Sequence, residues 1–315
     1  MQKDLFKKMG PPLPLSASMP KKSFNGEMTA LSWSEFFDTC EDIRVESRKA
    51  TFRVHRIGKE KGDEGALTFI LLHGAGHTSL SWALCAKEMA DANCQVFAFD
   101  CRAHGSTTSD DEEDLSVEVL TEDATSLIEQ CFNETKNQIV IVGHSMGGAI
   151  AARVAASGRV PRLVATIVID VVEALAALPG MHRILEARPQ HFPTLEDAIN
   201  WSIYSGMLKK SESARVSIPS QLVPSNGLTW RTRLEKTEPF WKGWFTDLSK
   251  TFLSVKGHRV LILAGTDRLD KELTIAHMQG RFQLILFPTC GHTIQEDDPQ
   301  RTAQALLQLQ TKNKW

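Results

Sequence analysis

The stretch from Ile139 to Ile150, IVIVGHSMGGAI, constrains this chain more than any other. Four apolar residues run directly into Gly143-His144-Ser145-Met146-Gly147, and small residues follow. This order predicts a strand, a sharp turn and a helix. A Gly-x-Ser-x-Gly turn in that context is a nucleophile elbow, in which the serine hydroxyl is exposed at a strained apex and the glycines let strand and helix approach closely. We therefore predict that Ser145 is a nucleophile.

Apolar runs and helix-like repeats alternate along the rest of the chain. Continuous apolar strands are typical of a mostly parallel sheet covered by helices on both faces, and we predict this α/β architecture here. The alternating segments at 43–45 and 51–57 predict an antiparallel pair at one sheet edge. The other predicted strands are 67–72, 95–99, 139–142, 163–169, 260–264 and 283–287, and the predicted helices are 80–90, 117–132 and 299–309.

One long segment interrupts this alternation. In residues 171–256 no strand pattern recurs, the sequence reads as helical, and four tryptophans occur. We predict that this segment is a helical cap inserted between the sixth and seventh strands, above the carboxyl ends where α/β sheets bind ligands. Residues 26–170 and 257–315 then form the core. Residues 1–25 carry four prolines and are predicted to form a flexible leader.

Charge and cysteine content exclude several classes of protein. The 36 lysines and arginines nearly balance the 38 acidic residues and cluster nowhere, so no nucleic-acid surface is predicted. The six cysteines are scattered without a CxxC pair, which favours free thiols in a reducing compartment over disulfides or a zinc site. No apolar run approaches membrane-spanning length, and the N-terminus lacks a signal-peptide core. We expect an intracellular protein, cytoplasmic and also nuclear, that is monomeric when free and binds no membrane, metal or cofactor.

A serine nucleophile needs a general base and a carboxylate that orients the base. His292 lies just past the last predicted strand, in a glycine-containing turn before a helix, where an α/β-hydrolase carries its histidine. Two aspartates are alternatives for the acid: Asp170 ends the strand after the elbow unit, and Asp267 follows the penultimate strand. Both can reach His292, and their spacing does not choose between them. His144 is predicted to pack beneath the elbow.

Ester hydrolysis also requires two N–H groups that stabilise the oxyanion of the tetrahedral intermediate. Met146, at the start of the predicted helix, supplies one of them. Gly74 or Ala75, in the loop after strand 67–72, supplies the second. This loop lacks the lysine and hydroxyl of a phosphate-binding loop, and a dinucleotide fingerprint does not fit it either. No nucleotide cofactor is therefore predicted.

Further motifs of the chain are specific to one family. They are GHSMGGAIA at 143–151, IDVVE at 169–173, ESARVS at 212–217, Thr229-Trp230, Trp241 with 243–245, and LAGTDRLDKELTIAHMQGRFQ at 263–283. On these motifs the chain, from about Trp33 to Leu309, resembles the protein phosphatase methylesterases, α/β-hydrolases that remove the methyl ester from the C-terminal leucine of the protein phosphatase 2A catalytic subunit.

The resemblance implies more than a fold. It implies a triad of Ser145, Asp170 and His292, the phosphatase 2A catalytic subunit as partner, and an active site that the partner rearranges. Asp267 is then a structural loop residue. The chain departs from the family in two places: the oxyanion loop reads Gly-Ala-Gly where members often have three glycines, and the long charged insertion that many members carry in the cap is missing.

Three hypotheses follow from these observations. The leading one is a methylesterase that acts on a protein C-terminus, with an acyl-enzyme on Ser145 and His292 as general base and acid. A general carboxylesterase for small acyl esters shares every triad residue and differs only in the cap. A protein that uses the hydrolase shell to hold the phosphatase in an inactive form is the third hypothesis.

Overall fold

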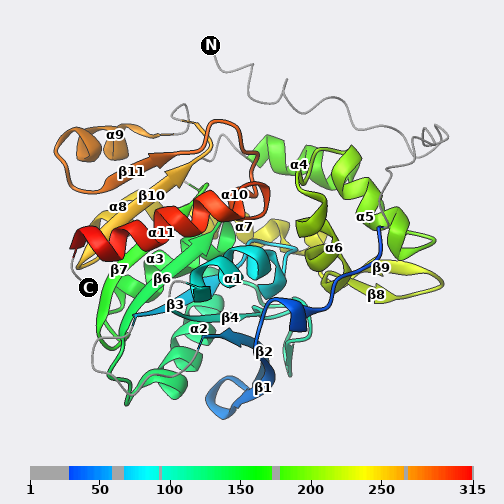
Figure 1. The fold of residues 1–315 in the computed structure, drawn as a ribbon, viewed down its shortest axis with the longest axis horizontal. Coiled ribbons are helices and arrows are strands. Elements are labelled where there is room, and N and C mark those ends of the chain that lie inside the picture. Colours follow the sequence, from blue (N-terminus) through cyan, green and yellow to red (C-terminus); the bar gives the residue numbers. More distant parts are fainter. Residues whose placement is uncertain (1–27, 59–66, 92–93, 172–177, 266–268, 314–315) are drawn as a thin grey trace.

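The computed structural model describes residues 28–58, 67–91, 94–171, 178–265 and 269–313, so the predicted leader lies outside the described residues (Figure 1). A mixed, mostly parallel sheet of nine strands runs through the molecule in the order β1-β2-β4-β3-β6-β7-β10-β11, with the short β5 paired to β2. These strands are β1 (Thr39–Val45), β2 (Ala50–Ile57), β3 (Leu67–Leu72), β4 (Gln95–Phe99), β5 (Thr108–Ser109), β6 (Gln138–His144), β7 (Leu163–Ile169), β10 (His258–Leu263) and β11 (Gln283–Leu286).

The register of the sheet follows from the character of its strands. β2 pairs antiparallel with β1, β4 and β5, while the strands from β4 to β11 pair in parallel. β3 is buried at all six positions, as expected for a parallel strand with helices on both faces. The predicted strands 67–72, 95–99 and 163–169 are confirmed with the same bounds, and the antiparallel pair does lie at an edge.

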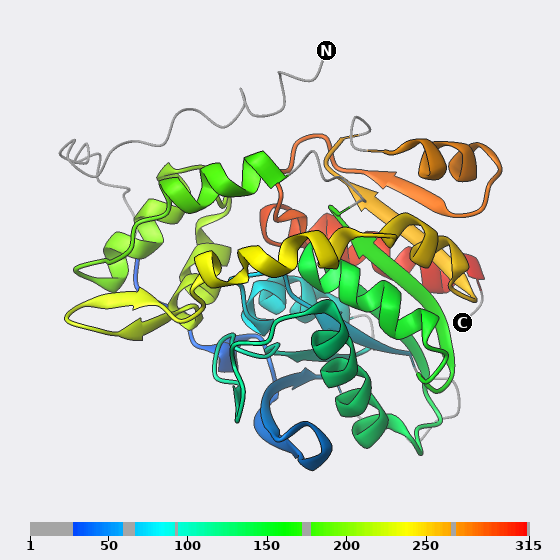
Figure 2. The same ribbon diagram turned by 180° about the vertical axis from the view of Figure 1, so that it is seen from behind.

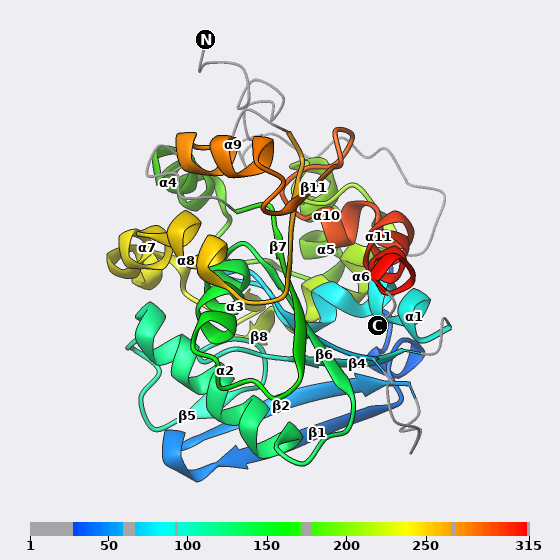
Figure 3. The same cartoon turned by 90° about the vertical axis from the view of Figure 1, so that its left-hand side faces the viewer.

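Helices cover both faces of the sheet (Figure 3). One core cluster joins the sheet to α2, α3, α7, α8 and α9, and a second cluster on the opposite face joins it to α1, α10 and α11. The helices are α1 (Ala83–Asp91), α2 (Val117–Phe132), α3 (Met146–Ala156), α4 (Leu178–Ala187), α5 (Leu195–Tyr204), α6 (Ser211–Ser220), α7 (Glu238–Phe245), α8 (Leu248–Ser254), α9 (Lys271–Met278), α10 (Ile294–Asp297) and α11 (Pro299–Asn313), with 3-10 turns at Trp33–Glu35, Glu46–Arg48, Ser79–Trp82 and Leu234–Thr237.

The segment between β7 and β10 is the predicted insertion, and it has two parts. Helices α5 and α6 surround a small apolar cluster of their own, which includes Phe192, Ile199 and Trp230. Helices α7 and α8 instead pack on α3, as Figure 2 shows in yellow against green. Setting aside the two-residue β5, the insertion does fall between the sixth and seventh strands of the sheet.

The expectation that the insertion contains no strands was wrong. A two-stranded hairpin, β8 (Leu222–Pro224) and β9 (Leu228–Trp230), pairs antiparallel within it. Each strand has only three residues, which is too short to show alternation. The turn itself did carry a signal, because Asn226 and Gly227 both adopt positive φ (42° and 111°), and an Asn-Gly pair favours such turns.

Other expectations concern absences. All six cysteines are free, so the prediction of unpaired thiols is confirmed. Within the described ranges, no group of three or more His, Cys, Asp or Glu side chains could hold a metal ion. No helix in that part of the chain has both the length and the apolar character needed to cross a membrane.

Candidate active site

The turn between β6 and α3 forces Ser145 into a strained conformation. Its φ of 52° and ψ of −120° lie where L-residues are rarely found, and its N–H donates to the Ile169 carbonyl at 3.0 Å. Glycine is required at both ends of this turn, since a Cβ on Gly143 would lie 2.1 Å from the Gly147 oxygen and one on Gly147 would lie 2.4 Å from the Leu72 oxygen. The strand and helix therefore pack as closely as the motif predicts.

Asp170 follows β7 and contacts His292. The His292 Nδ1–H donates to Asp170 Oδ2 at 2.7 Å, and Oδ1 accepts the Ala264 N–H at 3.1 Å. The Asp170 side chain is fully buried, whereas 45% of the His292 side chain is exposed. A buried carboxylate on Nδ1 fixes the tautomer and leaves Nε2 as the nitrogen available for proton transfer. The rival acid, Asp267, lies outside the described residues.

Ser145 and His292 are not joined by a hydrogen bond, although both belong to the described part of the chain. They are linked instead through the residue before the serine. His144 Nε2 lies 2.9 Å from the His292 carbonyl oxygen, and the two imidazole rings are 4.7 Å apart. Catalytic hydrogen bonds are often unformed in free enzymes and close only with substrate bound.

His144 has a definable protonation state. Burial holds its pKa well below the usual range, so the ring is neutral at neutral pH. Because a carbonyl oxygen only accepts, Nε2 carries the proton and donates it to His292. His144 thus lies under the elbow as predicted, and it also holds the main chain of His292, which the sequence did not indicate.

Sequence reasoning missed a carboxylate that braces the His292 turn. Asp297, in α10, accepts the Gly291 N–H at 2.6 Å and the Lys209 N–H at 2.9 Å. Burial raises the pKa of Asp297 above its ordinary value. Since Lys209 belongs to the insertion, this one side chain ties the insertion to the turn that carries His292. The only hint in the sequence was an acidic residue five positions after the predicted base.

A second missed carboxylate is Glu296, whose side chain is 1% exposed. Its Oε2 lies 3.3 Å from Nδ1 of His77, and neither carboxylate oxygen has a hydrogen bond within the described residues. The His77 ring packs edge-on against His144, with centroids 5.8 Å apart. The rings of His77 and His292 therefore both pack against His144, and Glu296 lies beside His77.

The loop after β3 lies against the nucleophile, as predicted for an oxyanion loop. A Cβ on Gly74 would be 3.2 Å from the Ser145 Cβ. The Gly76 N–H is used internally, because it donates to His104 Nε2 at 2.9 Å. In the described part of the chain, the N–H groups of Met146 and Ala75 have no hydrogen-bond acceptor. Both remain available to an oxyanion, so Met146, Ala75 and Gly74 stay the candidate donors.

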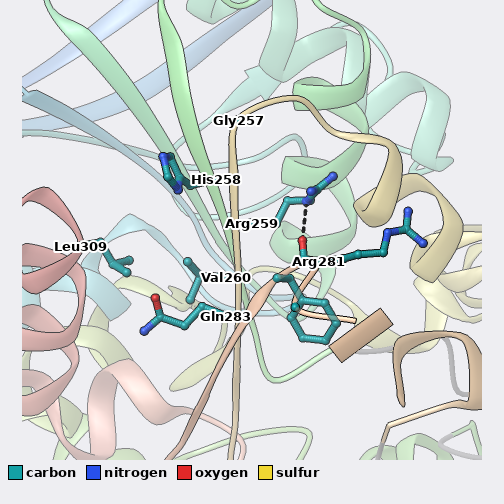
Figure 4. Close-up of a pocket in the computed structure, with 9 residues that line it drawn as sticks. Gly257, His258, Arg259, Val260, Arg281, Gln283 and Leu309 are labelled. Carbon is teal, nitrogen blue, oxygen red and sulfur yellow. Dashed lines mark hydrogen bonds between the residues drawn. The ribbon is translucent and has the colours of Figure 1, made fainter. Parts of the chain in front are cut away.

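A hollow of about 350 Å³ lies elsewhere, at the amino ends of β10 and β11 (Figure 4). It is lined by His258, Arg259 and Arg281 among others. Arg259 donates to the carbonyls of Arg281, Leu253 and Val255 at 2.9–3.0 Å, so its guanidinium holds the backbone around the hollow in place. Because Asp170 follows the carboxyl end of β7, this hollow is at the opposite edge of the sheet from the candidate active site.

Comparison with known proteins gives a consistent result. The Alpha/beta hydrolase family matches residues 69–305. A probable protein phosphatase methylesterase 1 of Caenorhabditis elegans is 44% identical over 299 residues, covering 93% of this chain and 79% of that protein. Protein phosphatase methylesterase 1 of Homo sapiens is 38% identical over 329 residues, covering 89% of this chain and 84% of that protein.

Solved structures agree on the fold. An E-2-(acetamidomethylene)succinate hydrolase superposes with a TM-score of 0.71 at 19% identity, over 85% of this chain and 98% of that one. An esterase of Mycobacterium tuberculosis superposes with a TM-score of 0.64 at 17% identity, over 86% of this chain and 91% of that one. At such low identity these similarities show the fold alone.

Proposed function

The chain belongs to the protein phosphatase methylesterases of the alpha/beta hydrolase family, and from this premise we propose that it demethylates the C-terminal leucine of the protein phosphatase 2A catalytic subunit. It is a carboxylic ester hydrolase. The observation that carries the substrate proposal is the extent of the similarity. At 38–44% identity it covers 89–93% of the chain and thus includes the insertion between β7 and β10, where the specificity of α/β enzymes resides.

The proposed chemistry passes through an acyl-enzyme. His292 Nε2 accepts the proton of Ser145 as Oγ attacks the ester carbonyl, and the N–H groups of Met146 and Ala75 stabilise the resulting oxyanion. The C–O bond to the methoxy group breaks as the His292 imidazolium donates its proton to the methoxy oxygen, so the group leaves as methanol. Water, activated by the same imidazole, then releases the leucine carboxylate and frees Ser145. Asp170 stabilises the imidazolium in both halves of the reaction.

The geometry favours a site in which the contact between Ser145 and His292 forms only when substrate binds. Asp170 already orients His292, and the Gly74 loop already lies against Ser145. The contact between Ser145 and His292 is the missing one. We propose that binding of the phosphatase closes it, since Lys209 in the insertion holds the His292 turn through Asp297.

The test is demethylation of purified, methylated phosphatase catalytic subunit, followed by mass spectrometry of its C-terminal peptide. Wild-type protein should release the methyl group, and Ser145→Ala should retain essentially all of it, since removing a serine nucleophile costs about 10⁶-fold in kcat. Retained methylation with wild type, together with rapid turnover of short synthetic esters, would identify a general carboxylesterase. Retained methylation with a stable complex would identify a binding protein.

We also propose an intracellular location, cytoplasmic and nuclear. All six cysteines are free, and Cys85, Cys94 and Cys101 are buried. Such thiols persist in a reducing compartment. Imaging of a tagged full-length chain tests this proposal, and secretion of the protein would contradict it.

A further inference from the structure

Arg188 forms no ion pair in the described part of the chain, although Glu235 is close enough for its charge to act on the guanidinium. It follows α4, and its guanidinium lies over the Trp230 ring, 3.7 Å from the ring centroid. Its side chain makes one long hydrogen bond, from Nη1 to the Thr232 carbonyl at 3.4 Å. Within the described ranges no carboxylate comes within ion-pair distance of it. Since a guanidinium has five N–H donors, most of its hydrogen-bonding capacity is unused.

Several other arginines of the chain pair with carboxylates, whereas Arg259 donates to three carbonyls. Arg53 pairs with Asp42 at 2.7 Å, Arg102 with Asp123 at 2.6 Å and Arg231 with Glu112 at 2.8 Å. The Arg188 residue is only partly buried, so part of it reaches solvent. The guanidinium is thus held in place by an aromatic ring, while most of its donors lack an acceptor in the described part of the chain.

The surroundings of Arg188 strengthen the attraction for an anion. Burial lowers its pKa to about 9, which leaves the side chain charged at neutral pH but poorly hydrated. The Trp230 ring packs against Phe192 and Trp201, with centroids 5.3 and 5.9 Å away, so one side of the guanidinium is a low-dielectric wall. A charge in such a setting interacts with an opposite charge more strongly than one in open water does.

The segment that accepts a hydrogen bond from Arg188 also contacts the oxyanion loop. The acceptor residue, Thr232, donates from Oγ1 to the Ala103 carbonyl at 2.8 Å. The next residue, His104, binds the Gly76 N–H of the oxyanion loop. Leu234, two residues after Thr232, lies 3.1 Å from where a Cβ on Gly76 would be. The segment that holds Arg188 therefore forms one wall next to the loop that faces Ser145.

We propose that Arg188 is a carboxylate-binding residue for the peptide substrate. It binds either an acidic side chain near the methyl ester or the C-terminal carboxylate that hydrolysis releases, and in both cases the guanidinium fork contacts two carboxylate oxygens. This inference rests on the proposed function, because it requires a peptide that ends in an ester. It adds to that function a preference for substrates with a negative charge close to the C-terminus.

The first experiment compares peptide methyl esters that carry Glu or Gln at each of the last positions before the leucine. Wild-type protein should prefer one Glu peptide over its Gln counterpart by about 10- to 100-fold in kcat/KM, as charged hydrogen bonds contribute at this level. Arg188→Gln should remove the preference, and Arg188→Lys should retain part of it through charge alone. The control is Arg233→Gln, a nearby exposed arginine paired with Glu235, which should keep the wild-type ratio.

The second experiment separates the two sources of the carboxylate. Binding of peptides with a free C-terminal carboxylate or a C-terminal amide is measured by calorimetry on Ser145→Ala, with and without Arg188→Gln. A preference for the free acid that Arg188→Gln removes identifies the product carboxylate as the ligand. If Arg188→Gln changes neither the Glu-to-Gln ratio nor the acid-to-amide ratio, the proposal is overturned.

These measurements remain informative if a variant folds poorly or the proposed function fails. Thermal unfolding of each variant is recorded, and Arg188→Lys replaces Arg188→Gln if the latter is unstable. Binding to Ser145→Ala requires no turnover. Selective, Arg188-dependent binding of acidic peptides by a protein that fails to demethylate the phosphatase would therefore refute the proposed function and support the carboxylate site.

Discussion

The strand ends of the core and the insertion above them differ in what holds their residues in place. Ser145 and Asp170 follow strands that are buried except at their first residues, and their backbones take positive φ values of 52° and 50°. Helices α7 and α8 of the insertion pack into the core cluster, whereas other parts of the insertion contact the core through polar groups, as in Lys209 with Asp297 and Arg231 with Glu112. Small changes at the strand ends meet rigid backbone, whereas these polar contacts can exchange with water. The catalytic residues are thus carried by the core, and we expect any partner-dependent adjustment at the polar contacts of the insertion.

The largest effect that would sharpen this comparison is expected at Asp170. Asp170→Asn should lower kcat by about 10⁴-fold, because the amide cannot hold the required His292 tautomer or stabilise the imidazolium. The measurement is methyl release from the phosphatase substrate, with thermal unfolding to show an intact fold. Asp267→Asn is the matched control and should retain near wild-type activity. The assignment of the acid fails if the two variants behave the other way round.

Substitution of a glycine in the elbow should have a smaller effect, but it should still strongly destabilise the fold. A Cβ at Gly147 would lie 2.4 and 2.5 Å from the carbonyl oxygens of Leu72 and His73, which belong to rigid backbone. Gly147→Ala should therefore lower the free energy of unfolding by about 2–4 kcal/mol. Urea unfolding measures this loss. A variant as stable as wild type would show that β3 and α3 can separate, contrary to the rigid core described above.

Acid should weaken the core before the insertion. Burial lowers the pKa of His55 and His73 to about 4 and holds those of His104 and His144 far below the usual range. Unfolded histidines titrate near about 6.5. Between that pH and the folded-state values, the unfolded chain binds more protons, so stability is present above about pH 6.5 and is lost as the pH falls.

We expect the Tm to fall by roughly 2–8 °C between pH 6.5 and 5. Scanning calorimetry at constant ionic strength measures this dependence. His191→Gln, at an exposed position in the insertion, should leave the profile unchanged. A Tm that stays constant across this range would show that the buried histidines do not control acid stability.

The smallest expected effect is a gain of stability from a substitution in the insertion. Gly243 lies in α7, and a Cβ there would meet nothing within 4 Å. Gly243→Ala should raise the free energy of unfolding by about 0.5–1 kcal/mol, because alanine has a higher helix propensity and loses less backbone entropy. Urea unfolding beside Gly147→Ala gives a direct contrast between the same substitution in core and insertion. If Gly147→Ala and Gly243→Ala lowered the free energy of unfolding equally, the distinction between core and insertion would not hold.

Much of the fold could be predicted from local patterns. Strands 67–72, 95–99 and 163–169 follow their apolar runs, because a strand covered on both faces has few polar positions. The elbow was predictable because few residues other than glycine fit beside Ser145 at those distances. The β8–β9 hairpin was missed because three-residue strands carry no periodicity.

The sequence by itself determined the sheet, the turn that presents Ser145 and the strand end that presents His292, since each depends on neighbours along the chain. Only the tertiary structure decided which groups meet at that edge. It placed Asp170 against His292 from 122 positions away, joined Lys209 to Asp297 and placed Arg188 over Trp230. These contacts depend on strand order and on the path of the insertion, and neither leaves a periodic trace in the sequence.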